Sequence, residues 1–140
     1  GDGDITAAVA PCFPDSGIDL YIGKGGSPEA VLAAAALKCL GGGMQTRMWF
    51  HDASHRADVA REVSAADLER VWRIDDLVVG ESALFCATGI SDSALLPGIR
   101  RIGHRAETHS ILMRARSRTV RRIHAIHDLD QKVVPLRSMP

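Results

Sequence analysis

The clearest pattern near the start of the chain is an alternating apolar run followed by an alanine-rich run. Residues 18–22, Ile-Asp-Leu-Tyr-Ile, alternate with the period of a β-strand, and residues 31–40 are dominated by Ala and Leu, which favour helix. Gly25 and Gly26 lie between the two runs. The pattern therefore predicts a strand, a glycine turn and a helix, in that order.

The ends of this helix are also marked in the sequence. Ser27 is a good N-cap, and Pro28 suits the first helical position because its missing N–H is no loss there. Three glycines at 41–43 follow the helical run and can adopt the left-handed backbone that ends a helix. We expect the helix to begin at Ser27 and Pro28 and to end at these glycines.

Strand-like patterns predominate in the second half of the chain, where residues 108–127 alternate in two runs typical of an antiparallel hairpin. The early alternation of strand and helix and the late clustering of strands predict an α/β fold of mixed α+β type. We expect one domain over residues 1–140, with a mixed sheet of about five strands covered by helices. The remaining expected elements are strands at 83–88 and 44–50, a helix at 65–72 capped by Ser64, and a polar helix or surface connection at 51–63.

Charge and hydropathy argue against two classes of partner. Lys plus Arg number 17, as do Asp plus Glu, so the net charge is zero and binding to nucleic acid or an anionic membrane is not expected. Arginines gather between Arg100 and Arg122, but no aromatic residue in that segment could stack on bases. The solvent face of a hairpin is the favoured interpretation, with a phosphate-attracting field or a subunit contact as alternatives. No run approaches about 18 apolar residues, so no membrane span is expected.

The cysteines and histidines do not indicate a disulfide framework or a zinc site. Cys12, Cys39 and Cys86 form no Cys-x-x-Cys pair and no even count, so reduced, buried thiols of a cytoplasmic protein are expected. Spacing makes zinc binding by the histidines an unfavoured hypothesis, because no His-Glu-x-x-His motif accompanies them.

Candidate chemistry begins at Gly25-Gly26-Ser27-Pro28-Glu29, which places backbone donors and one carboxylate at a helix N-terminus. The free N–H groups and the helix dipole favour phosphate there, and Glu29 could hold a hard divalent cation such as Mg²⁺ or Mn²⁺. The simpler interpretation is a Glu29 that only complements the dipole. The glycines do not match a P-loop or a dinucleotide-binding motif, since Lys24 precedes them.

A second candidate is Asp2-Gly3-Asp4, two carboxylates on either side of a glycine. The pair could bind a cation or accept hydrogen bonds from sugar hydroxyls. A turn or helix cap is the structural alternative. Calcium is not expected, because the apolar run after Asp4 replaces the further oxygen ligands that an EF-hand loop needs.

Five ordered motifs together resemble one known family. They are Asp2-Gly3-Asp4, Pro14-Asp15-Ser16, Gly25-Gly26-Ser27-Pro28-Glu29, Cys86-Ala87-Thr88-Gly89-Ile90 and Arg118-Thr119-Val120-Arg121-Arg122-Ile123. The chain is similar over nearly its whole length to the class II fructose-1,6-bisphosphatases of the GlpX type, within the lithium-sensitive phosphatase superfamily. The resemblance implies the C-terminal part of a sugar-phosphatase-like α-β-α-β-α sandwich.

The resemblance also implies roles for individual residues. Asp2, Gly3, Asp4 and Gly26 would contact the sugar phosphate, and Glu29 would ligate Mn²⁺ or Mg²⁺. The reaction would remove the 1-phosphate of fructose 1,6-bisphosphate in gluconeogenesis. We expect the other metal ligands and a water-activating threonine to lie in an N-terminal half with no counterpart here, so this chain alone should be inactive.

Other functions stay open from the sequence. The chain could be a non-catalytic sugar-phosphate-binding or interaction module, or part of a phosphatase for sedoheptulose 1,7-bisphosphate or an inositol phosphate. The expected partners are the sugar bisphosphate, the missing N-terminal half and further copies in a homo-oligomer. Because the chain begins without Met inside a motif, a proteolytic or cloned fragment is the expected origin.

Overall fold

A 14-residue helix, α2 (Ser27–Leu40), forms where the alanine-rich run predicts it. The structure is a computed structural model that describes residues 4–131. Gly41 ends α2 in the left-handed conformation (φ 77°), and its N–H donates to the carbonyl of Leu37, as the three glycines predict. The predicted cap is wrong by one residue, since extended Gly26 is the N-cap and Ser27 is already helical. Glycine serves at this position because an N-cap needs a non-helical backbone.

The central strand of the larger sheet is β5 (Arg105–Arg114), which pairs antiparallel with β6 (Thr119–Asp128) over its whole length. On its other edge β5 pairs with β3 (Leu84–Thr88) and with the short β4 (Arg100–Ile102). The predicted hairpin and the strand at 83–88 are therefore confirmed, whereas β4 was not predicted.

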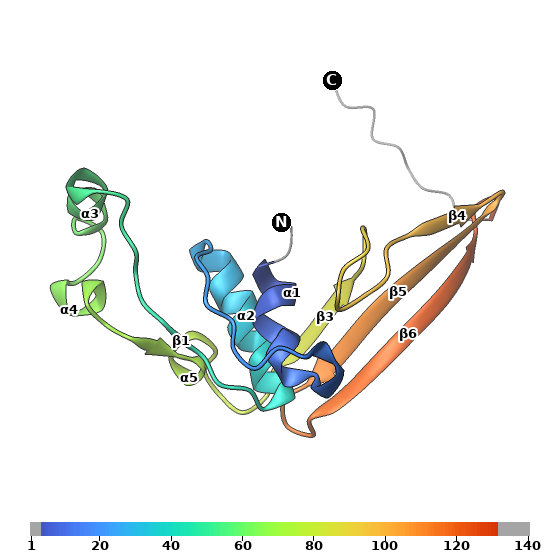
Figure 1. Ribbon diagram of the computed structural model, residues 1–140, viewed down its shortest axis with the longest axis horizontal. Helices are drawn as coiled ribbons and strands as arrows, with labels where there is room; N and C mark the ends of the chain where they lie inside the picture. Colours follow the sequence, from blue (N-terminus) through green and yellow to red (C-terminus); the bar gives the residue numbers. More distant parts are fainter. Residues whose placement is uncertain (1–3, 132–140) are drawn as a thin grey trace.

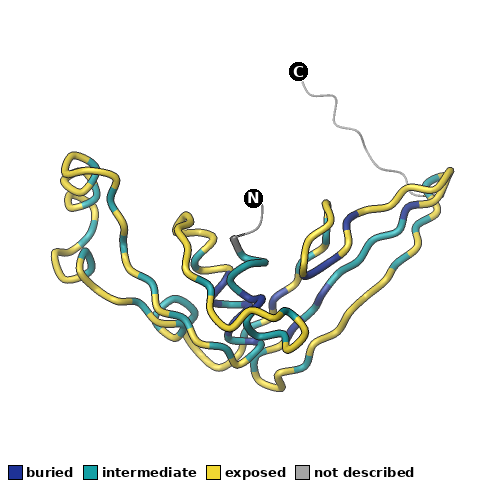
Figure 2. The backbone as a smooth tube through the Cα atoms, viewed as in Figure 1, coloured by how far each residue is buried: buried dark blue, intermediate teal, exposed yellow. Residues whose placement is uncertain are grey.

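The core lies where α2 and a short helix, α1 (Asp4–Val9), cover one end of this sheet (Figures 1 and 2). Alternate residues of β5 face the helices, so Ile111 and Met113 are fully buried. The alanines of α2 let its backbone approach the sheet closely. Two 3₁₀ turns, η1 (Ala10–Cys12) and η2 (Pro14–Ser16), follow α1.

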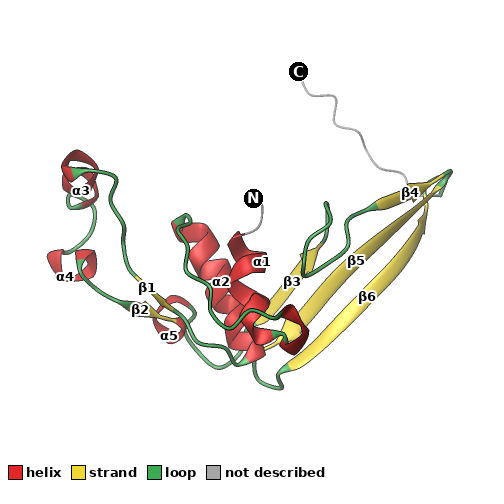
Figure 3. Ribbon diagram, in the orientation of Figure 1, coloured by secondary structure: helices red, strands yellow, loops and turns green. Residues whose placement is uncertain are grey.

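Between α2 and β3 the chain forms an arm, residues 45–79, that projects from the rest of the molecule (Figures 1 and 3). Its two strands pair antiparallel as a two-residue ladder. No residue from 41 to 84 is buried. Its elements are β1 (Gln45–Thr46), α3 (Ala53–Val59), α4 (Ala65–Leu68), β2 (Trp72–Arg73) and α5 (Ile74–Leu77).

In the arm the sequence predicts the elements but not their lengths. The strand expected at 44–50 is only two residues long, and the helix expected at 65–72 ends at Leu68. Ser64 caps that helix as predicted, since its hydroxyl accepts from the N–H of Asp67. Neither element packs on a core that would extend it, so local caps and turns set the boundaries.

The expected strand at 18–22 is wrong as a paired element. Residues 17–26 form neither helix nor strand, because no neighbouring strand among residues 4–131 pairs with them. The α/β class is confirmed. Among the described residues the strands fall into two sheets with only antiparallel pairings, where a single mixed sheet was expected. Within the described range no helix has the length and apolar character needed to cross a bilayer.

Candidate functional site

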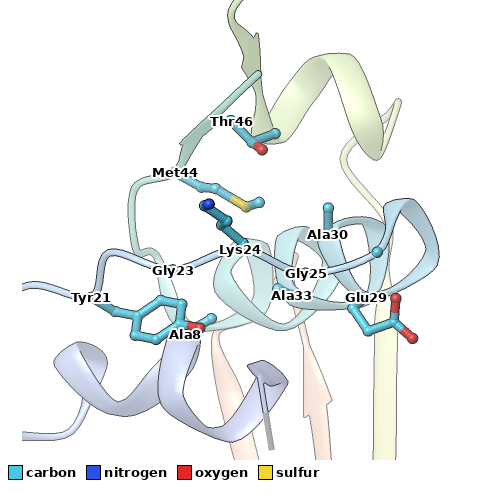
Figure 4. Close-up of a pocket in the computed structure, with 11 residues that line it drawn as sticks. Ala8, Tyr21, Gly23, Lys24, Gly25, Glu29, Ala30, Ala33, Met44 and Thr46 are labelled. Carbon is cyan, nitrogen blue, oxygen red and sulfur yellow. The ribbon is translucent and has the colours of Figure 1, made fainter. Parts of the chain in front are cut away.

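A small pocket lies where the extended segment before α2 passes the helix pair and the base of the arm (Figure 4). Its volume is about 90 Å³. The pocket is lined by Ala8 of α1, by Tyr21 and residues 23–26, by Glu29, Ala30 and Ala33 of α2, and by Met44 and Thr46. Residues 23–29 contain the glycine and glutamate motif singled out in the sequence.

Gly26 and Glu29 are in direct contact at the start of α2. A Cβ atom added to Gly26 would collide with Oε2 of Glu29, so a side chain at position 26 would displace the carboxylate. Glu29 is exposed, and its carboxylate forms no hydrogen bond or ion pair with another described residue. The structure therefore presents a free carboxylate directly over the N-cap glycine.

The helix start also offers free donors. Ala30 donates the first intrahelical bond to the carbonyl of Gly26, at 3.1 Å. The N–H groups of Ser27 and Glu29 precede that bond and have no acceptor among residues 4–131. These donors and the dipole of a 14-residue helix form an environment that favours an anion.

Lys24 is a pocket residue that the sequence did not single out. Its Nζ lies 3.5 Å from the centroid of the Trp49 ring, a cation–π contact that joins the extended segment to the arm. In Figure 4 its side chain points toward Met44 and Thr46, away from the side on which Glu29 lies. The only signal in the sequence was a lysine beside the glycine pair.

The second motif lies largely outside the described residues. Asp2 and Gly3 are outside the described range, whereas Asp4 is the first residue of α1. Helices α1 and α2 pack together and begin at the same end of the pair (Figure 1). The structure thus brings the start of the helix that contains Asp4 to the same end as Gly26 and Glu29.

No group of three His, Cys, Asp or Glu side chains in residues 4–131 could hold a metal ion. Among the described residues, Glu29 is the one carboxylate that lines the pocket. The described residues therefore fit a metal site in part: they offer one oxygen ligand of the kind that Mg²⁺ and Mn²⁺ prefer, and a complete site needs others.

The cysteines differ from one another more than expected. Cys39 is buried and Cys12 half-buried, and burial raises the pKa of both thiols. Cys86 is exposed on β3, so the expectation of three buried thiols is wrong for this residue. Its neighbour Phe85 faces the core, and the alternation of a strand turns Cys86 to the opposite face.

Comparisons with known proteins agree on one family. The model for "Bacterial fructose-1,6-bisphosphatase, glpX-encoded" matches residues 1–127. A Haemophilus influenzae protein named "Fructose-1,6-bisphosphatase class 2" is 40% identical over 140 aligned residues, which cover 92% of this chain and 42% of that protein. An Escherichia coli protein named "Fructose-1,6-bisphosphatase 1 class 2" is 39% identical over 142 residues, covering 94% and 42%. The aligned region spans less than half the length of each relative.

Proposed function

The chain belongs to the glpX-encoded bacterial fructose-1,6-bisphosphatase family, and from this premise we propose that it supplies part of the substrate and metal site of a phosphatase. The reaction is hydrolysis of the 1-phosphate of fructose 1,6-bisphosphate, giving fructose 6-phosphate and phosphate. The observation that carries the proposal is the start of α2, where the free carboxylate of Glu29 lies over Gly26 beside unbonded N–H groups.

The charges at this helix start favour a metal-dependent reaction. A phosphate bound by the N–H groups of Ser27 and Glu29 would lie near the Glu29 carboxylate. The two negative charges would repel each other. Glu29 would hold a divalent cation, whose charge would offset this repulsion. When bound, Mn²⁺ or Mg²⁺ polarises the phosphoryl group and activates water.

Gly26 and the two aspartates would bind and orient the substrate. Without a side chain, Gly26 leaves its backbone accessible to a phosphate oxygen. Asp2 and Asp4 would accept hydrogen bonds from sugar hydroxyls, and Gly3 would let the sugar phosphate approach between them. These contacts hold the ester in one orientation relative to Glu29.

Residues outside this chain would complete the site. A pocket of about 90 Å³ is well below the about 300–1,000 Å³ of typical ligand pockets. One carboxylate also falls short of a two-metal site, which must stabilise both the attacking and the leaving oxygen. The isolated chain should therefore be inactive, and the N-terminal part, assembly as a homo-oligomer, a cytoplasmic location and a role in gluconeogenesis belong to the same proposal.

Manganese-dependent phosphate release from fructose 1,6-bisphosphate by the product of the intact reading frame tests the proposal. Activity is expected in that product and not in residues 1–140 alone. Glu29→Gln should lower kcat at least about a hundredfold, because losing one metal ligand should cost at least as much as losing an outer-shell partner. Glu81→Gln, another exposed glutamate, should leave the rate unchanged.

Two results would redirect the assignment. Near-normal turnover by Glu29→Gln would remove Glu29 from the metal site. Preferred turnover of sedoheptulose 1,7-bisphosphate or an inositol phosphate would change the substrate, and binding of fructose 6-phosphate without any turnover by the intact product would favour a binding module.

A further inference from the structure

The segment 18–22 has the sequence of a strand but lies outside any helix or strand, with a bend at Asp19, and no strand in residues 4–131 pairs with it. Its three apolar side chains lie largely in solvent: Ile18 is 44% exposed, Leu20 73% and Ile22 86%. Tyr21, which alternates with them, is half-buried and lines the pocket. Tyr21 thus contributes to the pocket, while the three apolar side chains of the segment lie exposed.

The main chain of this segment is also unpaired. The N–H of Ile18 donates to the hydroxyl of Ser16 at 3.2 Å. Residues 19–25 make no main-chain hydrogen bond with any other described residue. A segment with a strand-like sequence, free backbone groups and exposed apolar side chains is a template for pairing with another strand.

We infer that residues 18–22 form a β-strand that pairs with a strand from the part of the same protein that lies outside this chain. The chain aligns with 42% of the length of its relatives, so 58% of that length (100 − 42) is available to provide the partner. The partner strand would carry apolar side chains to cover Ile18, Leu20 and Ile22.

The position of the segment favours this partner over a second copy. It runs directly into Gly25 and Gly26, and the pocket there needs residues from outside the chain. The polypeptide that completes the pocket therefore passes close to residues 18–22. Pairing would also fix the backbone of 23–26, and with it the start of α2. The inference depends on family membership and on the incomplete pocket of the proposed function, and its test requires no turnover.

Hydrogen exchange in the product of the intact reading frame tests the inference. Amides in residues 18–22 should exchange at least about a hundredfold more slowly than unstructured peptide, because strand pairing must open before exchange. The exposed connection at residues 80–82 serves as the internal control and should exchange within about tenfold of the unstructured rate. Equally fast exchange at 18–22 would overturn the inference.

Two variants test whether the slow exchange at residues 18–22 depends on the exposed apolar side chains of this segment. Leu20→Asp places a charge among these side chains and should abolish most of the protection at 18–22, whereas Val79→Asp, at a residue 84% exposed on the arm, should leave it unchanged. If Leu20→Asp fails to fold, the exchange pattern of the unmodified protein still decides. Protection that disappears on dilution would identify a second copy as the partner and would also overturn the inference. A protected but inactive protein would contradict the proposed phosphatase function alone.

Discussion

The larger sheet with its helix pair differs from the arm in the contacts that hold each region together. In the first region Ile111, Met113 and Cys39 are buried against α1 and α2. In the arm no residue is buried; Ile74 packs against the core in part, and other side-chain contacts include ion pairs and cation–π contacts. Exposed pairs of this kind contribute about 0–1 kcal/mol each, whereas a buried core residue contributes several times more.

The candidate pocket therefore joins a region with a buried core to one that is weakly held. Glu29 and Gly26 belong to the start of α2, whereas Met44 and Thr46 lie at the base of the arm. Lys24 over Trp49 is a direct contact between the extended segment and the arm. Movement of the arm would therefore change the pocket without disturbing the core, because regions with few buried contacts open at lower free energy.

The largest expected difference between the regions comes from burial. Ile111→Ala should lower the free energy of unfolding of the 140-residue chain by about 2–5 kcal/mol. Ile111 is fully buried, so the substitution removes apolar contacts and leaves a cavity in the core. Val79→Ala on the arm should change it by less than about 0.5 kcal/mol. Urea unfolding of both variants measures the difference, and similar losses would contradict the contrast between core and arm.

Lys38 connects α2 to the arm by two hydrogen bonds, and its replacement should have an intermediate effect. Its Nζ donates to the carbonyl of Val78 at 2.6 Å and to Asp75 at 2.8 Å. Lys38→Met keeps the length of the side chain and should cost about 1–2 kcal/mol, because the half-buried Val78 carbonyl loses a charged donor. If Lys38→Met increases hydrogen exchange, relative to the parent chain, more in α5 than in β5, the loss of stability is local to the arm.

Asp75→Asn is the matched control for that variant. The Asp75 side chain is 89% exposed, so its removal should cost less than about 0.5 kcal/mol. A loss as large as that of Lys38→Met would show that the ion pair, and not the Val78 carbonyl, connects the arm to α2.

The smallest effect should be the pH dependence that Asp76 gives to the arm. The N–H of Arg73 donates to the Asp76 carboxylate at 2.7 Å, and this hydrogen bond, assisted by Arg70, lowers the pKa of Asp76 in the folded chain. A lowered pKa stabilises the fold above the unfolded pKa, and this stabilisation is lost as the pH falls through the folded value. Asp76→Asn should therefore exchange faster in α5 at neutral pH and match the parent chain in acid. A difference that persists in acid would contradict this origin.

Local patterns predicted the parts of the fold whose partners are close in sequence. The hairpin of β5 and β6, the strand β3, helix α2 and its end at Gly41 follow from alternation, alanine content and glycine, all properties of neighbouring residues. The cap was wrong by one residue because Gly26 and Ser27 are both acceptable N-caps. The strand at 18–22 was wrong because alternation predicts the backbone shape but supplies no partner.

For the candidate site, the sequence alone determined the chemical groups and their order: the Asp-Gly-Asp motif, the glycine pair, the glutamate three residues after Gly26, and the family that these motifs indicate. Only the tertiary structure decided that the Glu29 carboxylate lies over Gly26, that α1 and α2 begin at the same end, and that Lys24 is held over Trp49. The physical reason is that residue type and local spacing determine propensity and charge, whereas contacts between distant segments depend on which surfaces pack together. The same reason explains why residues 18–22 remain unpaired among the described residues although their sequence is that of a strand.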